Sequence, residues 1–171
     1  MKIAVLGSGF IARFYAESLH SQRRKDYIHM VYSRNLSNAA KFAVDYQLNH
    51  FTFDMWEAIS HPETEVVLIA LPNHLHLEAV LACAKAKKAV LCTKPLGRNA
   101  KEAKEMLDAV EAAGIFAGYL EDLCYTPKFM NYVEFYCCDL GKDPMVELWG
   151  GDIGGINGRN WSHCWTSIVL E

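Results

Sequence analysis

The fold is decided by residues 2–12, which read KIAVLGSGFIA. An apolar strand pattern runs into a GxGxxA turn and then into a helix pattern. In that turn Gly7 permits the tight bend, Gly9 lets the backbone approach a pyrophosphate, and Ala12 lets the helix pack closely on the strand. The free N–H groups and the positive dipole end of the helix then face the phosphates. The stretch predicts a dinucleotide-binding unit at the start of the chain.

Outward from this turn, strand and helix patterns alternate. Strands are predicted over residues 2–6, 28–33, 49–52, 65–70, 89–92 and 115–119, and helices over about 10–22, 36–46, 54–60, 74–86 and 99–113. This alternation predicts an α/β fold with a Rossmann-type doubly wound parallel sheet in the strand order 3-2-1-4-5-6.

Local signals place two of the helix starts. Asn99 with Glu102, and Asp54 with Glu57, have the spacing of an N-cap and its third helical residue. The first helix is expected to pack through an apolar side made of Phe10, Ile11, Phe14 and Leu19.

Composition narrows the class of protein. The 171 residues carry a net charge of −3, which gives no electrostatic footprint for nucleic acid or an anionic membrane. No run of about 18 apolar residues is present, and Met1 leads directly into a strand pattern rather than a signal peptide. Six cysteines without metal-ligand spacing indicate free thiols. We therefore expect a cytoplasmic enzyme domain with no nucleic-acid or membrane partner.

The end of the second strand bears on the choice of cofactor. NAD-specific Rossmann domains usually carry an acid there to hold the ribose 2′-hydroxyl, whereas this chain has Ser33 and Arg34. The serine can hydrogen-bond a 2′-phosphate and the arginine can pair with it. NADP is therefore predicted in preference to NAD, with a solvated loop charge at Arg34 as the alternative.

The fourth strand runs into Leu71, Pro72 and Asn73. The proline stops the strand and the asparagine is expected to cap the next helix. His74 and His76 follow, but no third ligand of suitable spacing is nearby, so no metal site is predicted. One of these histidines is expected to contact the cofactor or the substrate.

The fifth strand ends in Thr93, Lys94 and Pro95, so the lysine lies where open α/β sheets bind ligands. The GSGFIA turn, the Ser33-Arg34 pair, the Pro72-Asn73-x-x-His76 loop and the Lys94-Pro95-Leu96 segment, in this order, resemble the glucose-fructose oxidoreductase / inositol dehydrogenase (Gfo/Idh/MocA) family over about residues 1–130.

This resemblance implies an NAD(P)-dependent oxidoreductase that transfers hydride from sugars, polyols or related hydroxy compounds to a nicotinamide. It implies that Lys94 is catalytic, beside the nicotinamide and the reacting hydroxyl, and that Glu121 edges the cofactor pocket. The implied cofactor-binding residues are Gly7, Ser8, Gly9, Phe10, Ile11, Ser33, Arg34, Leu71, Pro72, Asn73, His76, Lys94, Pro95 and Glu121.

The chain departs from the family pattern in two places. Thr93 stands where the family usually has a glutamate that would help to hold the lysine. Residues 1–120 form the predicted dinucleotide-binding domain, whereas residues 121–171 are expected to be a linker helix over 127–140 and the remnant of a truncated second domain. The apolar end over 161–170 is a candidate homo-oligomer contact.

Two alternatives to an active oxidoreductase remain at this point. One is a catalytically incomplete nucleotide-binding module, which the shortened second domain favours. The other is a methyltransferase that uses the same glycine-rich turn for S-adenosylmethionine, which the absence of an acid after the second strand and the presence of Lys94-Pro95 disfavour.

Overall fold

The computed structural model describes residues 1–22 and 25–121 of the chain. The chain divides into two compact units, Met1–Leu120 and Glu121–Glu171. The predicted helix over 127–140 and the apolar end over 161–170 lie outside the described residues.

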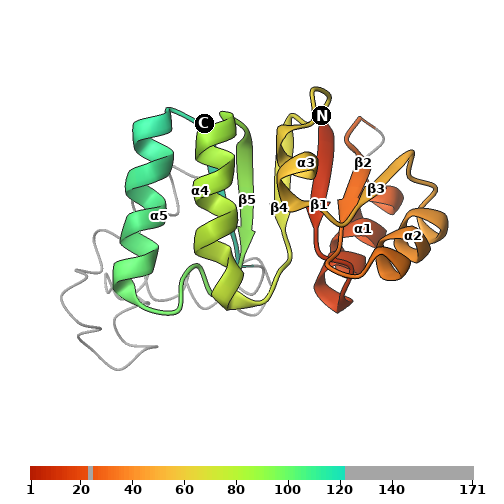
Figure 1. Ribbon diagram of the computed structural model, residues 1–171, viewed down its shortest axis with the longest axis horizontal. Coiled ribbons are helices and arrows are strands. Elements are labelled where there is room, and N and C mark those ends of the chain that lie inside the picture. The colour runs from red at the N-terminus through yellow and green to blue at the C-terminus, as the bar shows by residue number, and fades with distance from the viewer. Residues whose placement is uncertain (23–24, 122–171) are drawn as a thin grey trace, which may run out of the picture. The chain divides into compact units, whose positions relative to one another are not determined.

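Strands and helices alternate along the first unit (Figure 1). The strands are β1 (Lys2–Leu6), β2 (Tyr27–Tyr32), β3 (His50–Thr52), β4 (Val66–Ile69), β5 (Ala89–Thr93) and β6 (Ala117–Leu120). The helices are α1 (Phe10–Gln22), α2 (Leu36–Asp45), α3 (Met55–Ser60), α4 (His76–Ala86) and α5 (Ala100–Ala113), with a 3₁₀ turn, η1 (Asn73–Leu75), before α4. In this part of the chain no helix is long and apolar enough to cross a membrane.

All strand pairs are parallel, and the sheet order is β3-β2-β1-β4-β5-β6. The predicted fold class and strand order are confirmed. Each strand is linked to the next by a helix, because parallel neighbours need a crossover rather than a tight hairpin.

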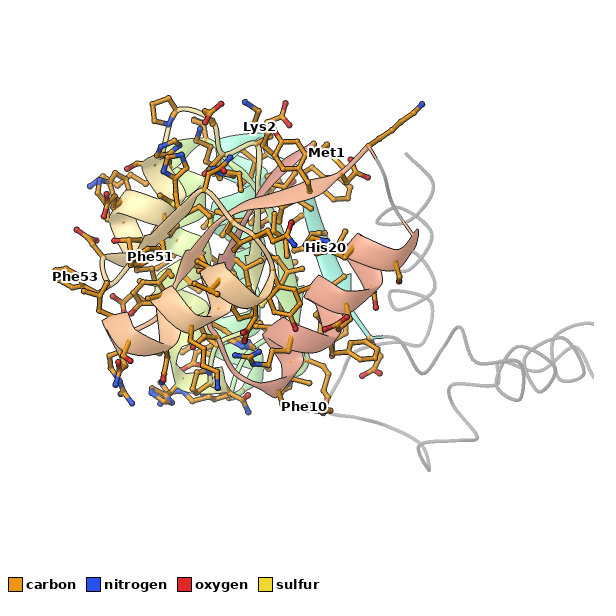
Figure 2. The ribbon with its side chains drawn as sticks, turned by 90° about the vertical axis from the view of Figure 1, so that its right-hand side faces the viewer. Met1, Lys2, Phe10, His20, Phe51 and Phe53 are labelled. Atoms are coloured by element: carbon orange, nitrogen blue, oxygen red, sulfur yellow. The ribbon has the colours of Figure 1, made fainter. Side chains whose placement is uncertain are left out.

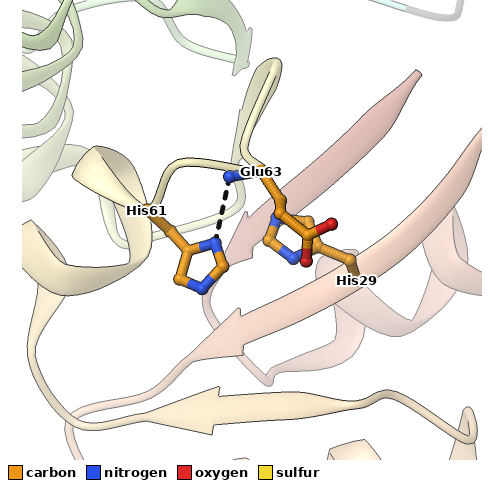
Figure 3. Close-up of side chains that lie close together, drawn as sticks. All are labelled: His29, His61 and Glu63. Atoms are coloured by element: carbon orange, nitrogen blue, oxygen red, sulfur yellow. Dashed lines mark hydrogen bonds between the residues drawn. The ribbon is translucent and has the colours of Figure 1, made fainter.

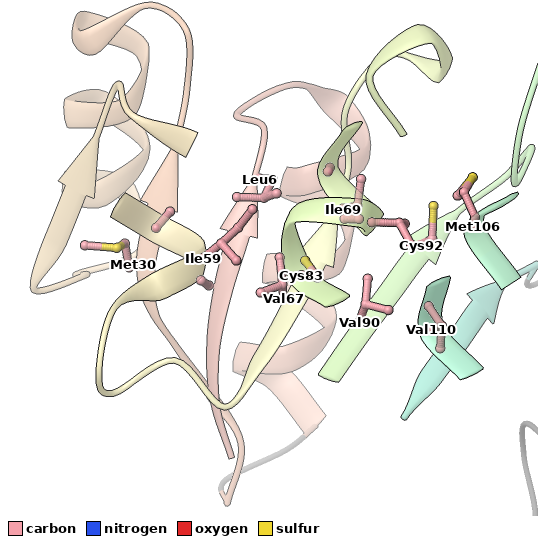
Figure 4. Close-up of a cluster of buried hydrophobic side chains, with 14 residues drawn as sticks. Leu6, Met30, Ile59, Val67, Ile69, Cys83, Val90, Cys92, Met106 and Val110 are labelled. Atoms are coloured by element: carbon pink, nitrogen blue, oxygen red, sulfur yellow. The ribbon is translucent and has the colours of Figure 1, made fainter. Parts of the chain in front are cut away.

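The core has two halves, one on each face of the sheet. Side chains alternate between the faces along a strand. In β1, Ile3 and Val5 therefore pack toward α1 and α2, whereas Ala4 and Leu6 pack toward α3, α4 and α5 (Figure 4). Burial on both faces explains why the central strands read as unbroken apolar runs.

Two of the predicted helix caps are confirmed and one is wrong. Asp54 Oδ1 accepts from the backbone N–H of Trp56 at 2.8 Å, and Asn99 Oδ1 accepts from the backbone N–H of Glu102 at 3.0 Å. Asn73 does not cap α4: it opens η1, and α4 begins at His76 without a side-chain cap.

The predicted apolar side of α1 is wrong for its aromatic members. Phe10 is 81% exposed, and Ile11 and Phe14 are exposed as well. Figure 2 shows Phe10 at the start of α1. The helix instead packs on the sheet through Ala12 and Ala16, both fully buried. Small side chains let the helix axis approach the sheet closely, which leaves no room for a phenylalanine beneath it.

Candidate cofactor site

The predicted site residues follow the carboxyl ends of neighbouring strands, which meet at one edge of the sheet. Gly7 follows β1, Ser33 follows β2, Lys94 follows β5 and Glu121 follows β6. Strand β1 pairs with β2 on one side and with β4 on the other, so the chain order reverses at β1. Ligands of open α/β sheets bind at the carboxyl edge beside such a reversal.

The glycine turn has the geometry that a phosphate cradle requires. Gly7 has a φ of +116°, and a Cβ on it would lie 2.4 Å from the carbonyl oxygen of Ala70. Its N–H donates to the carbonyl of Tyr32 at 2.9 Å, which fixes the turn against β2. A Cβ on Gly9 would meet no described atom within 4 Å. Open space therefore lies directly outside Gly9, just before α1 begins.

Ser8 and Ser33 join the first two strand ends. The Ser8 hydroxyl donates to the Ser33 hydroxyl at 2.9 Å, and the backbone N–H of Ser33 donates to Thr52 at 3.1 Å. Arg34 follows on the surface, and within the described part of the chain its guanidinium has no hydrogen-bond or ion-pair partner. Asn35 then caps α2 through its Oδ1, which accepts from Ser37 N at 2.9 Å. Arg34 therefore lies between Ser33, which is bonded to Ser8, and the cap residue of α2.

His76, predicted to contact the cofactor or the substrate, lies in the core. Its side chain is fully buried, and its ring lies between the carbonyls of Leu71 and Pro95. The Nε2···O and Nδ1···O distances to these two carbonyls are both 2.9 Å. The ring therefore ties the loop after β4 to the loop after β5. Its role in this structure is to position those loops, because neither nitrogen faces open space.

We expect His76→Leu to lower the free energy of unfolding by about 1–3 kcal/mol. A neutral imidazole carries one N–H, so the substitution leaves one of the two carbonyls without its donor, and an unsatisfied group costs about 1–3 kcal/mol. Urea unfolding followed by circular dichroism measures the change. His74→Leu is the matched control, because His74 is exposed and its replacement should change stability by no more than about 0.5 kcal/mol. Equal losses of stability in His76→Leu and His74→Leu would show that the hydrogen bonding of His76 does not stabilise the fold.

Lys94 and Pro95 are exposed on the loop that follows β5, and the peptide bond between them is cis. Thr93 before them is buried, and Leu96 packs against the core. Among the described residues no carboxylate pairs with the Lys94 ammonium. The lysine thus lies at the carboxyl edge of the sheet between buried Thr93 and partly buried Leu96, and its own side chain is exposed.

Two cysteines of the core are unsuited to chemistry. Cys83 and Cys92 are free and buried, and burial raises the pKa of each thiol to about 12. The reactive form of cysteine is the thiolate, so both side chains act as packing groups.

Comparison with known proteins agrees with this geometry. Residues 1–119 match the family described as an oxidoreductase family with an NAD-binding Rossmann fold. The scyllo-inositol 2-dehydrogenase (NADP(+)) IolU of Bacillus subtilis is 31% identical over 130 residues, which cover 75% of this chain and 39% of that protein. The trans-1,2-dihydrobenzene-1,2-diol dehydrogenase of Mus musculus is 32% identical over 117 residues, which cover 68% of this chain and 35% of that protein.

A solved structure of a relative has a similar fold. Levoglucosan dehydrogenase, in complex with NADH and levoglucosan, superposes with a TM-score of 0.69 at 28% identity over 79% of this chain and 38% of that chain. The chain thus spans less than half the length of these relatives.

Proposed function

The chain belongs to the Gfo/Idh/MocA family of oxidoreductases, and from that premise we propose that it binds NADP(H) at the carboxyl edge of its sheet and serves the oxidation or reduction of a sugar, polyol or related hydroxy compound. The observation that carries the proposal is the turn from Gly7 to Gly9, with open space outside Gly9 and the start of α1 directly behind it. These residues fit a pyrophosphate, because glycine keeps that space clear and the helix start offers free N–H groups.

The preference for NADP(H) rests on Ser33 and Arg34. A 2′-phosphate carries charge that an acidic residue would repel, and neither position is acidic. The guanidinium is exposed and has no partner among the described residues, so it is available to the phosphate. Family relatives include one named for NADP(+) and one solved with NADH, so the family does not decide this point.

We expect Arg34→Ala to narrow or reverse the preference for NADPH over NADH by about tenfold or more. A charge-assisted hydrogen bond contributes about 1.5–3 kcal/mol, and about 1.4 kcal/mol corresponds to a factor of ten. Fluorescence titration of both cofactors measures the ratio. Lys41→Ala is the matched control, because it removes the same charge from an exposed position on α2. Equal affinities in the wild type, or an unchanged ratio in Arg34→Ala, would contradict the assignment.

Lys94 is the residue proposed to act on the substrate. When bound, the nicotinamide supplies the carbon that accepts or returns the hydride. Lys94 Nζ takes the proton of the reacting hydroxyl during oxidation and returns it during reduction. The loop after β5 orients this amine, and Phe10 and Ile11 at the start of α1 offer exposed apolar surface for the cofactor.

A nucleotide-binding module without catalysis is the second candidate. It is favoured by Thr93, which replaces an acidic partner of Lys94, and by the missing carboxylate contact among the described residues. Titration with NADPH, NADH and S-adenosylmethionine, followed by a panel of sugars and polyols, separates the candidates. Binding without turnover of any substrate would support the module, and binding of S-adenosylmethionine alone would contradict both readings.

A further inference from the structure

Three ligand-type side chains meet at the amino ends of the strands. His29 lies in β2, His61 follows α3, and Glu63 lies in the turn that leads to β4 (Figure 3). One nitrogen or carboxylate oxygen of each residue lies within 4.8 Å of the others. In Figure 2, Lys2 at the start of β1 marks this end of the sheet, and Phe10 marks the opposite, cofactor end. The cluster is therefore separate from the proposed cofactor site.

One ring nitrogen of His29 has an unused lone pair. Its side chain is 2% exposed, and Nδ1 has no hydrogen-bond partner among the described residues. Its Nε2 lies 3.0 Å from the hydroxyl of Thr64, which itself donates to the carbonyl of Ala58 at 2.9 Å. Because the hydroxyl proton is already used, His29 Nε2 is the donor and Nδ1 is unprotonated.

This hydrogen-bond pattern is typical of a metal-binding histidine. Such a histidine donates one ring N–H to a neighbouring group, which orients the ring and leaves the other nitrogen for the metal. With its proton on Nε2 and Nδ1 unprotonated the ring is neutral, as a ligand must be. A buried ring nitrogen without a hydrogen-bond partner destabilises the fold, and a bound cation removes this cost.

The other two groups are in a form suited to coordination. The Lys2 ammonium forms an ion pair with Glu63 Oε1, which requires the carboxylate form. Glu63 Oε2 has no hydrogen-bond partner among the described residues. The His61 Nδ1 accepts from the backbone N–H of Glu63 at 3.2 Å, a long bond that a metal can replace. The ring of His50 lies beside the cluster, with its centroid 5.3 Å from that of His61.

We propose that His29, His61 and Glu63 bind one Zn²⁺ ion, with water completing the coordination. Two imidazole nitrogens and one carboxylate form a ligand set that suits Zn²⁺, whereas Mg²⁺ and Ca²⁺ favour oxygen ligands. The ion ties β2 to the segment between α3 and β4. Its effect is on the stability of the fold, because the cluster and the cofactor site lie at opposite ends of the strands.

Zinc titration of the full chain without an affinity tag, freed of metal by chelation, tests the proposal. We expect one Zn²⁺ to bind at His29, His61 and Glu63 and to raise the melting temperature, since a ligand that binds the native state stabilises it. Isothermal titration calorimetry should show affinity at least about tenfold weaker for Glu63→Gln and for His61→Ala. Both positions are less buried than His29, so these variants should fold.

Two further variants test whether the ion binds at this cluster. Glu65→Gln is the matched control, an exposed carboxylate two residues from Glu63 and outside the cluster, and it should bind zinc like the wild type. Lys2→Gln removes a positive charge that contacts Glu63, and it should bind zinc several-fold more tightly. Absence of zinc binding in the wild type would overturn the proposal. Binding that Glu63→Gln and His61→Ala leave unchanged would overturn it equally, because the ion would then sit on other ligands.

Discussion

Replacing Lys94 with alanine is expected to reduce turnover by about 10²–10⁴-fold while NADPH affinity stays within a few-fold. That range is the usual contribution of a positioned proton-transfer group, which acts in the transition state far more than in binding. The lysine stands at the carboxyl end of β5 with its ammonium free of any ion pair among the described residues. No other lysine lies in the loop from Lys94 to Asn99.

Turnover is measured in the chain itself and in a chimera that carries the substrate domain of a family member after Leu120. The chimera supplies substrate positioning, which can contribute about 7–11 kcal/mol to a reaction barrier. Lys101→Ala is the control, an exposed lysine in the first turn of α5. Unchanged turnover in Lys94→Ala would show that Lys94 is not catalytic. A parallel loss of cofactor affinity would reassign the lysine to binding.

The second prediction with a large effect concerns Gly7 and Gly9, whose substitutions are expected to affect different properties. We expect Gly9→Val to weaken NADPH binding by at least about 100-fold, or about 2.7 kcal/mol, and to leave the far-UV circular dichroism unchanged. No described atom lies within 4 Å of a Cβ at this position, so the protein itself tolerates a side chain there. The valine would occupy the space assigned to the pyrophosphate.

Gly7→Ala should instead lower the stability of the fold. Its φ of +116° and the 2.4 Å approach of a Cβ to the Ala70 carbonyl make the substitution costly for folding itself. Strained backbone conformations cost about 1–3 kcal/mol before the steric overlap is added, so we expect about 3 kcal/mol or more of lost stability. Urea unfolding and cofactor titration of both variants test the pair. Retained binding in Gly9→Val would remove the turn as evidence for a dinucleotide site.

Much of this architecture was determined by local sequence. Apolar runs and helical periodicity predict every strand and α-helix of the first unit but not the 3₁₀ turn η1, because elements buried on both faces or on one stripe leave a repeating pattern. The caps at Asp54 and Asn99 are predictable because each bonds to a backbone N–H only two or three residues away. The Gly7 turn is predictable from the GxGxxA pattern, although its contacts with Tyr32 and Ala70 are made between residues distant in sequence.

Packing partners were decided only by the tertiary structure. An apolar periodicity does not tell which members touch the sheet, and α1 uses Ala12 and Ala16 while Phe10 and Phe14 remain exposed. Likewise, the sequence places His76 in a loop, and only the structure shows that its ring lies between carbonyls of two loops that meet after β4 and β5 pair.

The cluster of His29, His61 and Glu63 shows most clearly what the sequence alone does not predict. His29 lies in β2, whereas His61 and Glu63 lie between α3 and β4, and no spacing rule links positions so far apart in the chain. They meet because β2 and the segment before β4 lie on either side of β1 in the parallel sheet. The sequence thus determined the elements and their order through short-range bonds and periodicity. The chemistry of side chains that are distant in sequence was decided by the crossovers that bring them together.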